Sequence, residues 1–291
     1  ERLRREGGEL TARPVPDLPA GRHIALPGRG TTFIREIAGP ADAPVVFLLH
    51  GWTATADLNF FMCYAALGGH FRVVAIDHRG HGRGIRTSRP FSLSDCADDV
   101  VAVADELGIE KFIPVGYSMG GTIAQLVWKR HHSRVRGLVL AATSGYFASH
   151  TIEKRRFALL TTVMHASRVT PKPVRDWISD RLFVSRKTMV WEPWAVAQVA
   201  SHEWRHVLEA GSALGRYDSR GWLGNIDVPV SVIINDSDHV VATKRQRELA
   251  AAIPGARTWE VSGDHDSVWA IAAQFVPALV EACTHASGLR V

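Results

Sequence analysis

Seven short and largely apolar runs are spaced along the chain, and they predict β-strands. A strand that is covered on both faces of a sheet shows nearly continuous hydrophobic residues, whereas a strand with one wet face alternates. Several of the runs are almost wholly apolar, so they predict a sheet buried inside the protein. They are residues 31–37, 44–49, 71–76, 112–115, 137–142, 228–234 and 256–261.

Segments with apolar residues at helical spacing lie between these runs. Ser94 and Asp95 are suitable N-terminal caps for the first of them. Alternation of strand and helix is typical of an α/β fold with a mostly parallel central sheet and helices on both faces. The expected helices cover residues 94–107, 119–131, 243–252 and 267–282.

Residues 144–227 interrupt the alternation, because they contain no strand-like run and several helix-like pieces. Five of the nine tryptophans lie there: Trp177, Trp191, Trp194, Trp204 and Trp222. Helices inserted before the strand at 228–234 predict a cap over a pocket. The alternative is that the tryptophans only pack the insertion onto the body. We therefore expect an N-terminal arm at 1–22, an α/β core at 23–143 and 228–291, and a helical cap at 144–227.

The composition mainly excludes certain classes of protein. The 291 residues are 46% hydrophobic and 22% charged, as in an ordinary globular protein. The net charge of +5 is spread along the chain, so we expect no nucleic-acid partner. No apolar run reaches the 18 or more residues of a membrane span. The first twenty residues lack a signal-peptide core, which favours a cytoplasmic location; the sequence does not indicate an oligomeric state.

The cysteines do not indicate a metal site or a disulfide framework. Cys63, Cys96 and Cys283 are odd in number and far apart in sequence. We expect three buried, reduced thiols.

The segment GYSMG at 116–120 carries the first chemical signal. Its pattern G-x-S-x-G follows a predicted strand and opens a predicted helix, which is the setting of a nucleophile elbow. In such a sharp turn a Cβ at Gly116 or Gly120 would collide with its surroundings. The glycines thus leave room for the hydroxyl of Ser118 at the carboxyl edge of the sheet, above a helix N-terminus that favours negative charge.

A serine hydroxyl needs a base, and the base needs an acid that holds its tautomer. In this architecture the acid and then the histidine follow the serine, each beyond a strand. The loop after 228–234 offers Asp236 and Asp238, and the loop after 256–261 offers His265. His239 is adjacent to Asp238 in sequence and cannot easily fold back on it. His285, beyond the last helix, is a further candidate base; we favour His265.

An oxyanion hole would complete the site. One donor is expected to be the amide of Met119, which follows the serine. The other is expected in the loop after 44–49, where the amide of Trp52 follows His50 and Gly51. We also expect Trp52, Tyr117 and Tyr146 to contact the substrate.

Together these motifs resemble the α/β-hydrolase superfamily, in particular its cap-bearing esterase, lipase and haloperoxidase-like members. The matching segments appear in the family's order and cover about residues 24–283. They are HGW at 50–52, DHRGHGRG at 77–84, GYSMGG at 116–121, NDSD at 235–238 and GDH at 263–265.

The resemblance also assigns details within these motifs. In this family the acid loop usually has the sequence G-x-x-D, and this pattern favours Asp238 over Asp236 as the acid. Asn235 replaces the glycine of that loop, and Gly84 stands where relatives often have serine; we expect neither departure to affect the chemistry. The family uses the segment around His78 and His81 as a structural turn, so no metal is expected there.

The resemblance implies a serine hydrolase that cleaves a carboxylic ester through an acyl-enzyme, without metal or organic cofactor. The tryptophan-rich insertion suggests a small-molecule ester with an apolar or aromatic acyl group. The same triad could serve cofactor-free haloperoxidase or perhydrolase chemistry, a thioesterase or a C–C bond hydrolase. A ligand-sensing receptor on the same scaffold is less favoured, as is a zinc protease using the H-E-x-x-H string of His202, Glu203 and His206.

Overall fold

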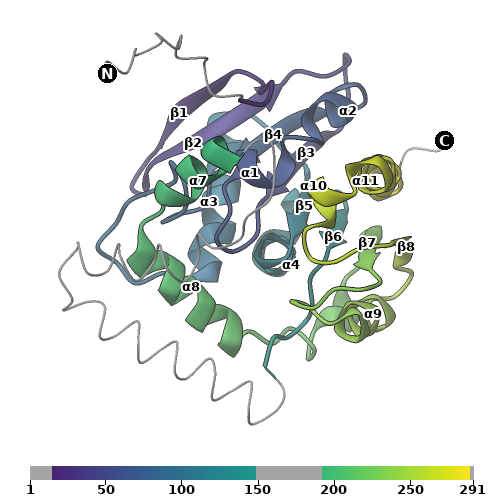
Figure 1. Ribbon diagram of the computed structural model, residues 1–291. Helices are drawn as coiled ribbons and strands as arrows, with labels where there is room; N and C mark the ends of the chain where they lie inside the picture. Colours follow the sequence, from purple (N-terminus) through teal and green to yellow (C-terminus); the bar gives the residue numbers. More distant parts are fainter. Residues whose placement is uncertain (1–14, 149–191, 289–291) are drawn as a thin grey trace, which may run out of the picture.

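The computed structural model describes residues 15–148 and 192–288, and it places one eight-stranded sheet at the centre (Figure 1). The strand order is β1-β2-β4-β3-β5-β6-β7-β8. The strands are β1 (Gly21–Leu26), β2 (Gly30–Ile37), β3 (Val45–Leu49), β4 (Arg72–Ile76), β5 (Ile113–Tyr117), β6 (Leu138–Ala141), β7 (Val230–Asn235) and β8 (Arg257–Val261).

The sheet is mostly parallel, as the sequence predicts. From β4 to β8 every neighbouring pair runs parallel, whereas β2 pairs antiparallel with both β1 and β4. All seven predicted strands are present. The strand β1 was not predicted, and its first two residues fall in the segment expected to be an arm. Residues 1–14 of that arm lie outside the described residues.

Helices cover both faces of the sheet. They are α1 (Ala56–Phe60), α2 (Tyr64–Gly68), α3 (Leu93–Glu106), α4 (Met119–His131), α7 (Glu192–Ala200), α8 (Trp204–Arg216), α9 (Thr243–Ala252), α10 (Ser267–Ala270) and α11 (Ala272–Ser287). The expected cap of the 94–107 helix was wrong. The helix begins at Leu93, and Ser92 is the N-cap, since its hydroxyl accepts from the amide of Asp95 at 3.4 Å.

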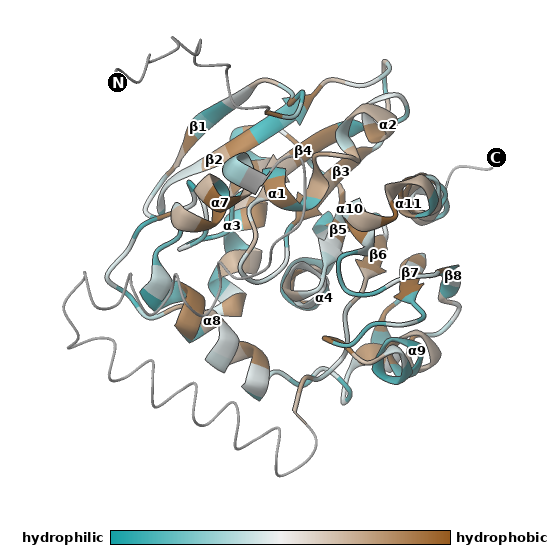
Figure 2. Ribbon diagram, viewed as in Figure 1, coloured by the Kyte–Doolittle hydropathy of each residue, from teal (hydrophilic) through white to brown (hydrophobic). Residues whose placement is uncertain are grey.

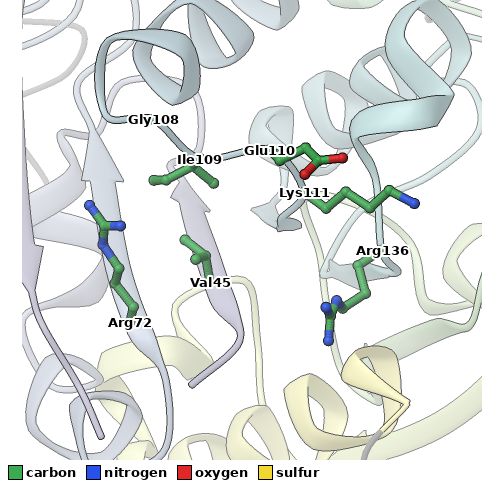
Figure 3. Close-up of a pocket in the computed structure, with 7 residues that line it drawn as sticks. All are labelled: Val45, Arg72, Gly108, Ile109, Glu110, Lys111 and Arg136. Carbon is green, nitrogen blue, oxygen red and sulfur yellow. The ribbon is translucent and has the colours of Figure 1, made fainter. Parts of the chain in front are cut away.

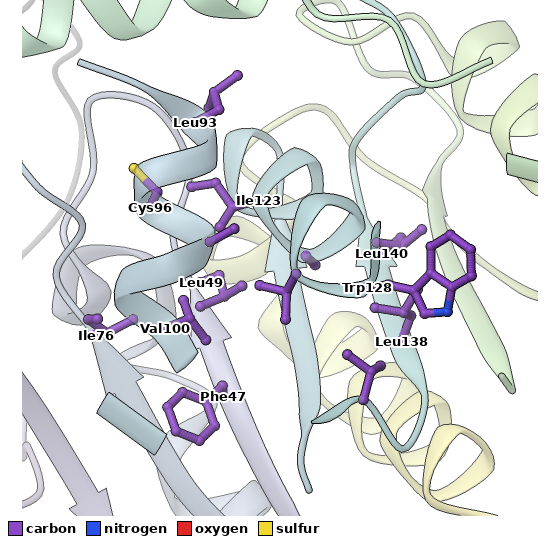
Figure 4. Packing of buried hydrophobic residues seen from close by; sticks show 14 of the residues in the cluster. Phe47, Leu49, Ile76, Leu93, Cys96, Val100, Ile123, Trp128, Leu138 and Leu140 are labelled. Atoms are coloured by element: carbon purple, nitrogen blue, oxygen red, sulfur yellow. The ribbon is translucent and has the colours of Figure 1, made fainter. Parts of the chain in front are cut away.

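The two cores lie on opposite faces of the sheet because strand side chains alternate. On β3, Phe47 and Leu49 enter the cluster beneath α3 and α4, whereas Val46 and Leu48 enter the cluster beneath α2 and α11. Figure 4 shows part of the first cluster, including Phe47 and Leu49 beside Val100 of α3. Burial on both faces explains why these strands read as continuous apolar runs.

The inner strands are the most apolar part of the fold. In Figure 2, β6 and β7 are drawn mainly in brown, and every residue of both strands is buried. The outer strand β8 is paler and largely exposed. Among the helices of residues 15–148 and 192–288, none has the length and apolarity that a bilayer crossing requires.

The interval between β6 and β7 contains the helices α7 and α8 and a short turn of 3-10 helix at Leu223–Asn225. Residues 149–191 of the predicted cap, including Trp177 and Trp191, lie outside the described residues. Each described tryptophan of the interval packs against neighbouring residues. Trp194 is 8% exposed with its ring 5.5 Å from that of Phe61, and Trp222 stacks on Trp128 at 6.0 Å.

Candidate active site

The turn from β5 into α4 holds Ser118 in a strained conformation. Its φ of 53° and ψ of −116° lie in a region that residues with a Cβ rarely adopt. A Cβ at Gly116 would overlap the backbone of Gly120, and a Cβ at Gly120 would overlap the carbonyl of Leu49. The expected need for glycine at both positions is therefore confirmed. Because the Ser118 side chain makes no capping bond to α4, its hydroxyl is available to other groups.

Three loops bring Ser118, His265 and Asp238 into one chain of contacts. Ser118 Oγ lies 2.9 Å from His265 Nε2, and His265 Nδ1 lies 2.8 Å from Asp238 Oδ2. The loops follow β5, β8 and β7 respectively. Each begins at the carboxyl end of a parallel strand, so all three reach the same edge of the sheet.

The carboxylate of Asp238 is held by further donors. Its Oδ1 accepts from the amides of Val240 and Val241, both at 2.8 Å, and its Oδ2 accepts from Gln246 Nε2 at 3.0 Å. The side chain of Asp238 is fully buried, whereas that of His265 is 18% exposed. A buried, multiply bonded carboxylate beside a more accessible imidazole is suited to orienting the imidazole and stabilising its protonated form.

The other candidate acids and bases lie elsewhere. Asp236 binds the amide of Gly263 at 3.1 Å and does not contact His265. His239 is 83% exposed and pairs with Asp264 at 3.0 Å. His285 lies on α11, where its Nδ1 is 2.9 Å from Ser231 Oγ. The structure thus brings together the residues that the sequence favours.

The loop after β3 passes directly beside the serine. A Cβ on Gly51 would stand 3.3 Å from Ser118 Cβ, and the amide of Gly51 donates to Asn59 Oδ1 at 2.8 Å. This places the backbone of Trp52 next to the elbow. Met119 is the first residue of α4, and the first amides of a helix have no acceptor within it. Both expected oxyanion donors therefore belong to segments that flank Ser118.

The residues expected to contact the substrate differ in their burial and in their hydrogen-bond partners. The indole of Trp52 is partly buried and donates to the carbonyl of Val207 on α8 at 2.6 Å. Tyr117 is only 3% exposed, and its hydroxyl donates to the carbonyl of His265 at 2.8 Å. Its phenol has almost no surface to offer a substrate, because the side chain of the last β5 residue points into the core beneath the His265 loop.

Tyr146 lies on the α9 side of the molecule. Its hydroxyl donates to Glu248 of α9 at 2.6 Å, and its ring lies between Arg220 and Arg245, at 4.3 and 5.0 Å. These partners account for its position without a substrate.

The H-E-x-x-H string does not form a metalloprotease arrangement. The helix α8 begins at Trp204, so His202 precedes it and the two histidines do not share a helical face. His202 Nδ1 accepts from the amide of Gly82 at 2.8 Å, and His206 Nδ1 lies 2.9 Å from Glu203. Within residues 15–148 and 192–288, no three His, Cys, Asp or Glu side chains are grouped as metal ligands would be.

The histidines around the β4–α3 turn are buried, and the rings of His50 and His81 contact backbone groups, whereas neither ring nitrogen of His78 has a hydrogen-bond partner among the described residues. His50 Nε2 accepts from the amide of His78 at 2.9 Å. Burial lowers the pKa of His50, and it lowers those of His78 and His81 further. Burial likewise lowers the pKa of His202 to about 4. These imidazoles are neutral at physiological pH, and His202 joins the turn to the segment before α8 by accepting from the amide of Gly82.

The cysteines are buried, as expected for structural thiols. Cys63, Cys96 and Cys283 are free, and burial raises the pKa of each, that of Cys63 to about 12.

Gln246 was not foreseen from the sequence. It bonds to Asp238 from α9, eight residues away along the chain. One signal was available, because Gln246 occupies the same helical face as the buried Leu249 and Ala250. A buried amide on an apolar face needs hydrogen-bond partners.

A separate hollow of about 490 Å³ lies at the opposite, amino-terminal edge of the sheet (Figure 3). Its lining comes from the starts of β3 and β4 and from the segments before β5 and β6. The residues are Val45, Arg72, Gly108, Ile109, Glu110, Lys111 and Arg136. Since Ser118 and His265 lie at the other edge, this hollow is not part of the candidate site.

Comparison with known proteins places this chain in a family. Over 225 residues the chain is 29% identical to the bifunctional esterase/perhydrolase of Acinetobacter calcoaceticus, covering 70% of this chain and 77% of that protein. Among solved structures, the enol-lactonase from Burkholderia xenovorans LB400 is 27% identical with a TM-score of 0.71, covering 90% of this chain and all of the other.

A further solved structure is alike in fold alone. The esterase from Exiguobacterium antarcticum is 20% identical, with a TM-score of 0.74 and coverage of 90% of this chain and 98% of that one. The family model described as the alpha/beta hydrolase fold matches residues 44–269. That match spans the elbow and the loops of Asp238 and His265, and the chain therefore belongs to the α/β-hydrolase family.

Proposed function

We propose that this α/β hydrolase is a serine esterase that cleaves a carboxylic ester through an acyl-enzyme. The observation that carries the proposal is the unbroken contact chain from Ser118 through His265 to Asp238, at 2.9 and 2.8 Å. Both distances are those of hydrogen bonds, and they match the arrangement of nucleophile, base and orienting acid.

In the first half-reaction, Ser118 Oγ attacks the ester carbonyl while His265 Nε2 takes the hydroxyl proton. Asp238 keeps the other imidazole proton on Nδ1 and stabilises the imidazolium that forms. The amides of Met119 and Trp52 donate to the oxyanion, each worth on the order of 3 kcal/mol of the barrier. His265 then protonates the departing alkoxide, which leaves as an alcohol.

In the second half-reaction, water attacks the acyl-enzyme. His265 accepts a proton from the water, and the tetrahedral intermediate collapses with return of that proton to Ser118 Oγ. The carboxylic acid leaves, and no metal or redox step enters this sequence.

An apolar or aromatic acyl group remains the proposed substrate class, on narrower support. The described tryptophans of the 144–227 interval are packed against neighbours, so they support the packing alternative rather than a pocket lining. The partly buried indole of Trp52, in the loop whose Gly51 approaches Ser118, is an apolar group carried close to the nucleophile. A chain-length series of p-nitrophenyl esters tests this, and highest kcat/KM for the acetyl ester would contradict it.

Perhydrolysis is the second candidate, because the 29% identical relative carries both esterase and perhydrolase in its name. Hydrogen peroxide would replace water in the second half-reaction, and the product would be a peroxy acid. Release of peroxy acid from an ester plus hydrogen peroxide, detected as oxidation of iodide faster than in the same mixture without the enzyme, distinguishes this activity from hydrolysis alone.

A fluorophosphonate probe tests the proposal directly. It phosphonylates a serine only where a base activates the hydroxyl. We expect labelling of the intact protein at Ser118, identified by peptide mapping, and none in Ser118→Ala. Labelling at another serine, or ester turnover retained by Ser118→Ala, would contradict the assignment.

A further inference from the structure

A buried polar cluster lies directly beneath the His265 loop. It consists of Tyr117 at the end of β5, Asn235 at the end of β7 and Ser267 at the start of α10. Tyr117 is 3% exposed, and Asn235 and Ser267 are fully buried. Polar groups so deeply buried are costly unless hydrogen-bonded, so their partners reveal what they hold.

Every polar side-chain hydrogen of the cluster has a hydrogen-bond acceptor. The Tyr117 hydroxyl donates to the carbonyl of His265 at 2.8 Å. Asn235 Nδ2 donates to the carbonyl of Asp264 at 2.9 Å and, at 3.4 Å, to the Tyr117 oxygen. The Ser267 hydroxyl donates to Asn235 Oδ1 at 2.8 Å. The opposite amide orientation would face two oxygens toward one another, so this network fixes the orientation of Asn235.

The two carbonyls that the cluster binds are those of consecutive residues. The Asp264 carbonyl belongs to the peptide plane before the His265 Cα, and the His265 carbonyl belongs to the plane after it. Fixing both planes fixes φ and ψ of His265, because these are the only soft backbone torsions at that residue. These two torsions determine the direction of the His265 Cα–Cβ bond. They thereby determine how the imidazole is placed relative to Ser118.

Asn235 also connects to the acid. Its backbone amide donates to Gln246 Oε1 at 3.0 Å, and Gln246 Nε2 donates to Asp238 Oδ2 at 3.0 Å. The same carboxylate oxygen faces His265 Nδ1. Since Tyr117 immediately precedes Ser118, Asn235 is bonded to segments adjoining all three members of the triad.

We propose that Asn235 and Tyr117 are positioning residues that set the backbone of His265 relative to Ser118 and Asp238. This inference rests on the proposed function, because it assigns these residues a role in aligning that triad. It differs from the expectation that the asparagine at 235 leaves the chemistry unaffected. Asparagine supplies an amide donor to the base loop that a glycine at this position would lack.

The test compares Tyr117→Phe with Tyr64→Phe. Tyr64 is a second buried tyrosine, 2% exposed, whose hydroxyl donates to Asp57 at 3.3 Å rather than to the triad loops. Each substitution removes one hydroxyl from a buried phenol. The parent and both variants are assayed for kcat and KM on one p-nitrophenyl ester, for the site of fluorophosphonate labelling, and for urea unfolding.

We expect Tyr117→Phe to lower kcat by about tenfold with little change in KM, because small misplacements of a reacting group slow the chemistry more than they weaken binding. Tyr64→Phe should keep kcat within about twofold of the parent while losing similar stability. Ser267→Ala should lower kcat less than Tyr117→Phe, since the bond from Tyr117 to the His265 carbonyl remains. Asn235→Ala should lower it most, and if that variant does not fold, the other two decide.

Two results distinguish failure of the positioning role from failure of the proposed function. A parent labelled at Ser118 with equal kcat in Tyr117→Phe and Tyr64→Phe overturns the positioning role and leaves the proposed function standing. A parent that is not labelled at Ser118 overturns both.

Discussion

The indole nitrogen of Trp52 donates a hydrogen bond of 2.6 Å to the carbonyl of Val207, which joins the loop after β3 to the first turn of α8. Val207 is fully buried, and the next bond of this interface runs from Thr55 to Gln198 of α7 at 2.9 Å. The segment proposed to supply an oxyanion donor is therefore anchored by the helices between β6 and β7. A change in that anchor should affect both stability and catalysis.

Trp52→Phe removes this bond and keeps an aromatic ring in place. We expect the free energy of unfolding to fall by about 1 kcal/mol, because Val207 loses a donor at a partly buried site. We also expect kcat to fall, since the loop that carries the Trp52 amide is less firmly held. Urea unfolding and ester kinetics measure the two effects.

Trp259→Phe is the matched control for that substitution. Its indole donates to Glu281 at 3.1 Å on the exposed side of β8, far along the sheet from β3. An exposed bond of this kind contributes little, so kcat should be unchanged. Equal kcat in the two variants would show that the Trp52 anchor has no part in catalysis.

Asp238→Asn tests the orienting acid. The amides of Val240 and Val241 both donate to Oδ1, which therefore must remain the oxygen of the new side chain. The amide nitrogen would then face His265 Nδ1 and favour the tautomer with its proton on Nε2. That imidazole cannot accept the proton of Ser118, and we expect kcat to fall by about 10⁴.

Asp236→Asn is the control two residues away. Asp236 is exposed and its carboxylate binds Ser237 and the amide of Gly263, not His265. We expect its ester turnover to match the parent's. An equal loss in both variants would indicate a general effect of the loop rather than the tautomer of His265.

The inner strands of the sheet could be predicted from the sequence because buried parallel strands consist of nearly continuous apolar residues. Each of the seven predicted strands is present, with ends within three residues of those expected. The strand β1 was missed because it has no such apolar run. It lies at the edge of the sheet, where it pairs with β2, and of its six residues only Ile24 and Leu26 are buried. A run of GRHIAL with two buried positions gives almost no periodic signal.

The loops of the candidate site were predictable because chain order fixes which strand ends meet at one edge of a parallel sheet. The side chains beneath them were not. Asn235, Gln246 and Ser267 act through hydrogen bonds between elements that are distant in sequence, and a single sequence contains no pairing information for them. Tyr117 was expected to contact the substrate. Tyr117 instead points into the core as the last residue of β5, whereas Ser118 lies beyond the strand in the turn with φ of 53°.

Acid should destabilise the fold through its buried histidines. Burial holds the pKa of His202 near 4 and those of His78 and His81 well below their ordinary values. In the unfolded chain each histidine titrates near 6.5. Below that pH the unfolded state binds protons that the folded state does not, so the free energy of unfolding should fall as pH is lowered from about 6.5 toward 4.

His202→Asn isolates one contribution to that dependence. Asparagine Oδ1 can replace Nδ1 as acceptor for the amide of Gly82, but it does not titrate. Urea unfolding at pH 7.5, 6.5, 5.5 and 4.5 should give a shallower decline for the variant than for the parent. Parallel declines would mean that His202 is not buried and neutral in solution.

Glu203→Gln separates the serine mechanism from a zinc mechanism based on H-E-x-x-H. A zinc protease would use this glutamate as general base, so the substitution would abolish turnover. Here the carboxylate is 31% exposed, and its ion pairs within residues 15–148 and 192–288 are with His206 and Arg205, at 2.9 and 3.3 Å.

We therefore expect Glu203→Gln to keep ester turnover within about twofold of the parent, as for most surface substitutions. Ser118→Ala, measured beside it, should lose at least about 10³ in kcat while unfolding at the same urea concentration. The reverse pattern, with stoichiometric zinc found by elemental analysis of the purified parent, would favour the metal. The distinction holds because the two substitutions remove the base of one mechanism and the nucleophile of the other, and neither changes the volume of the core.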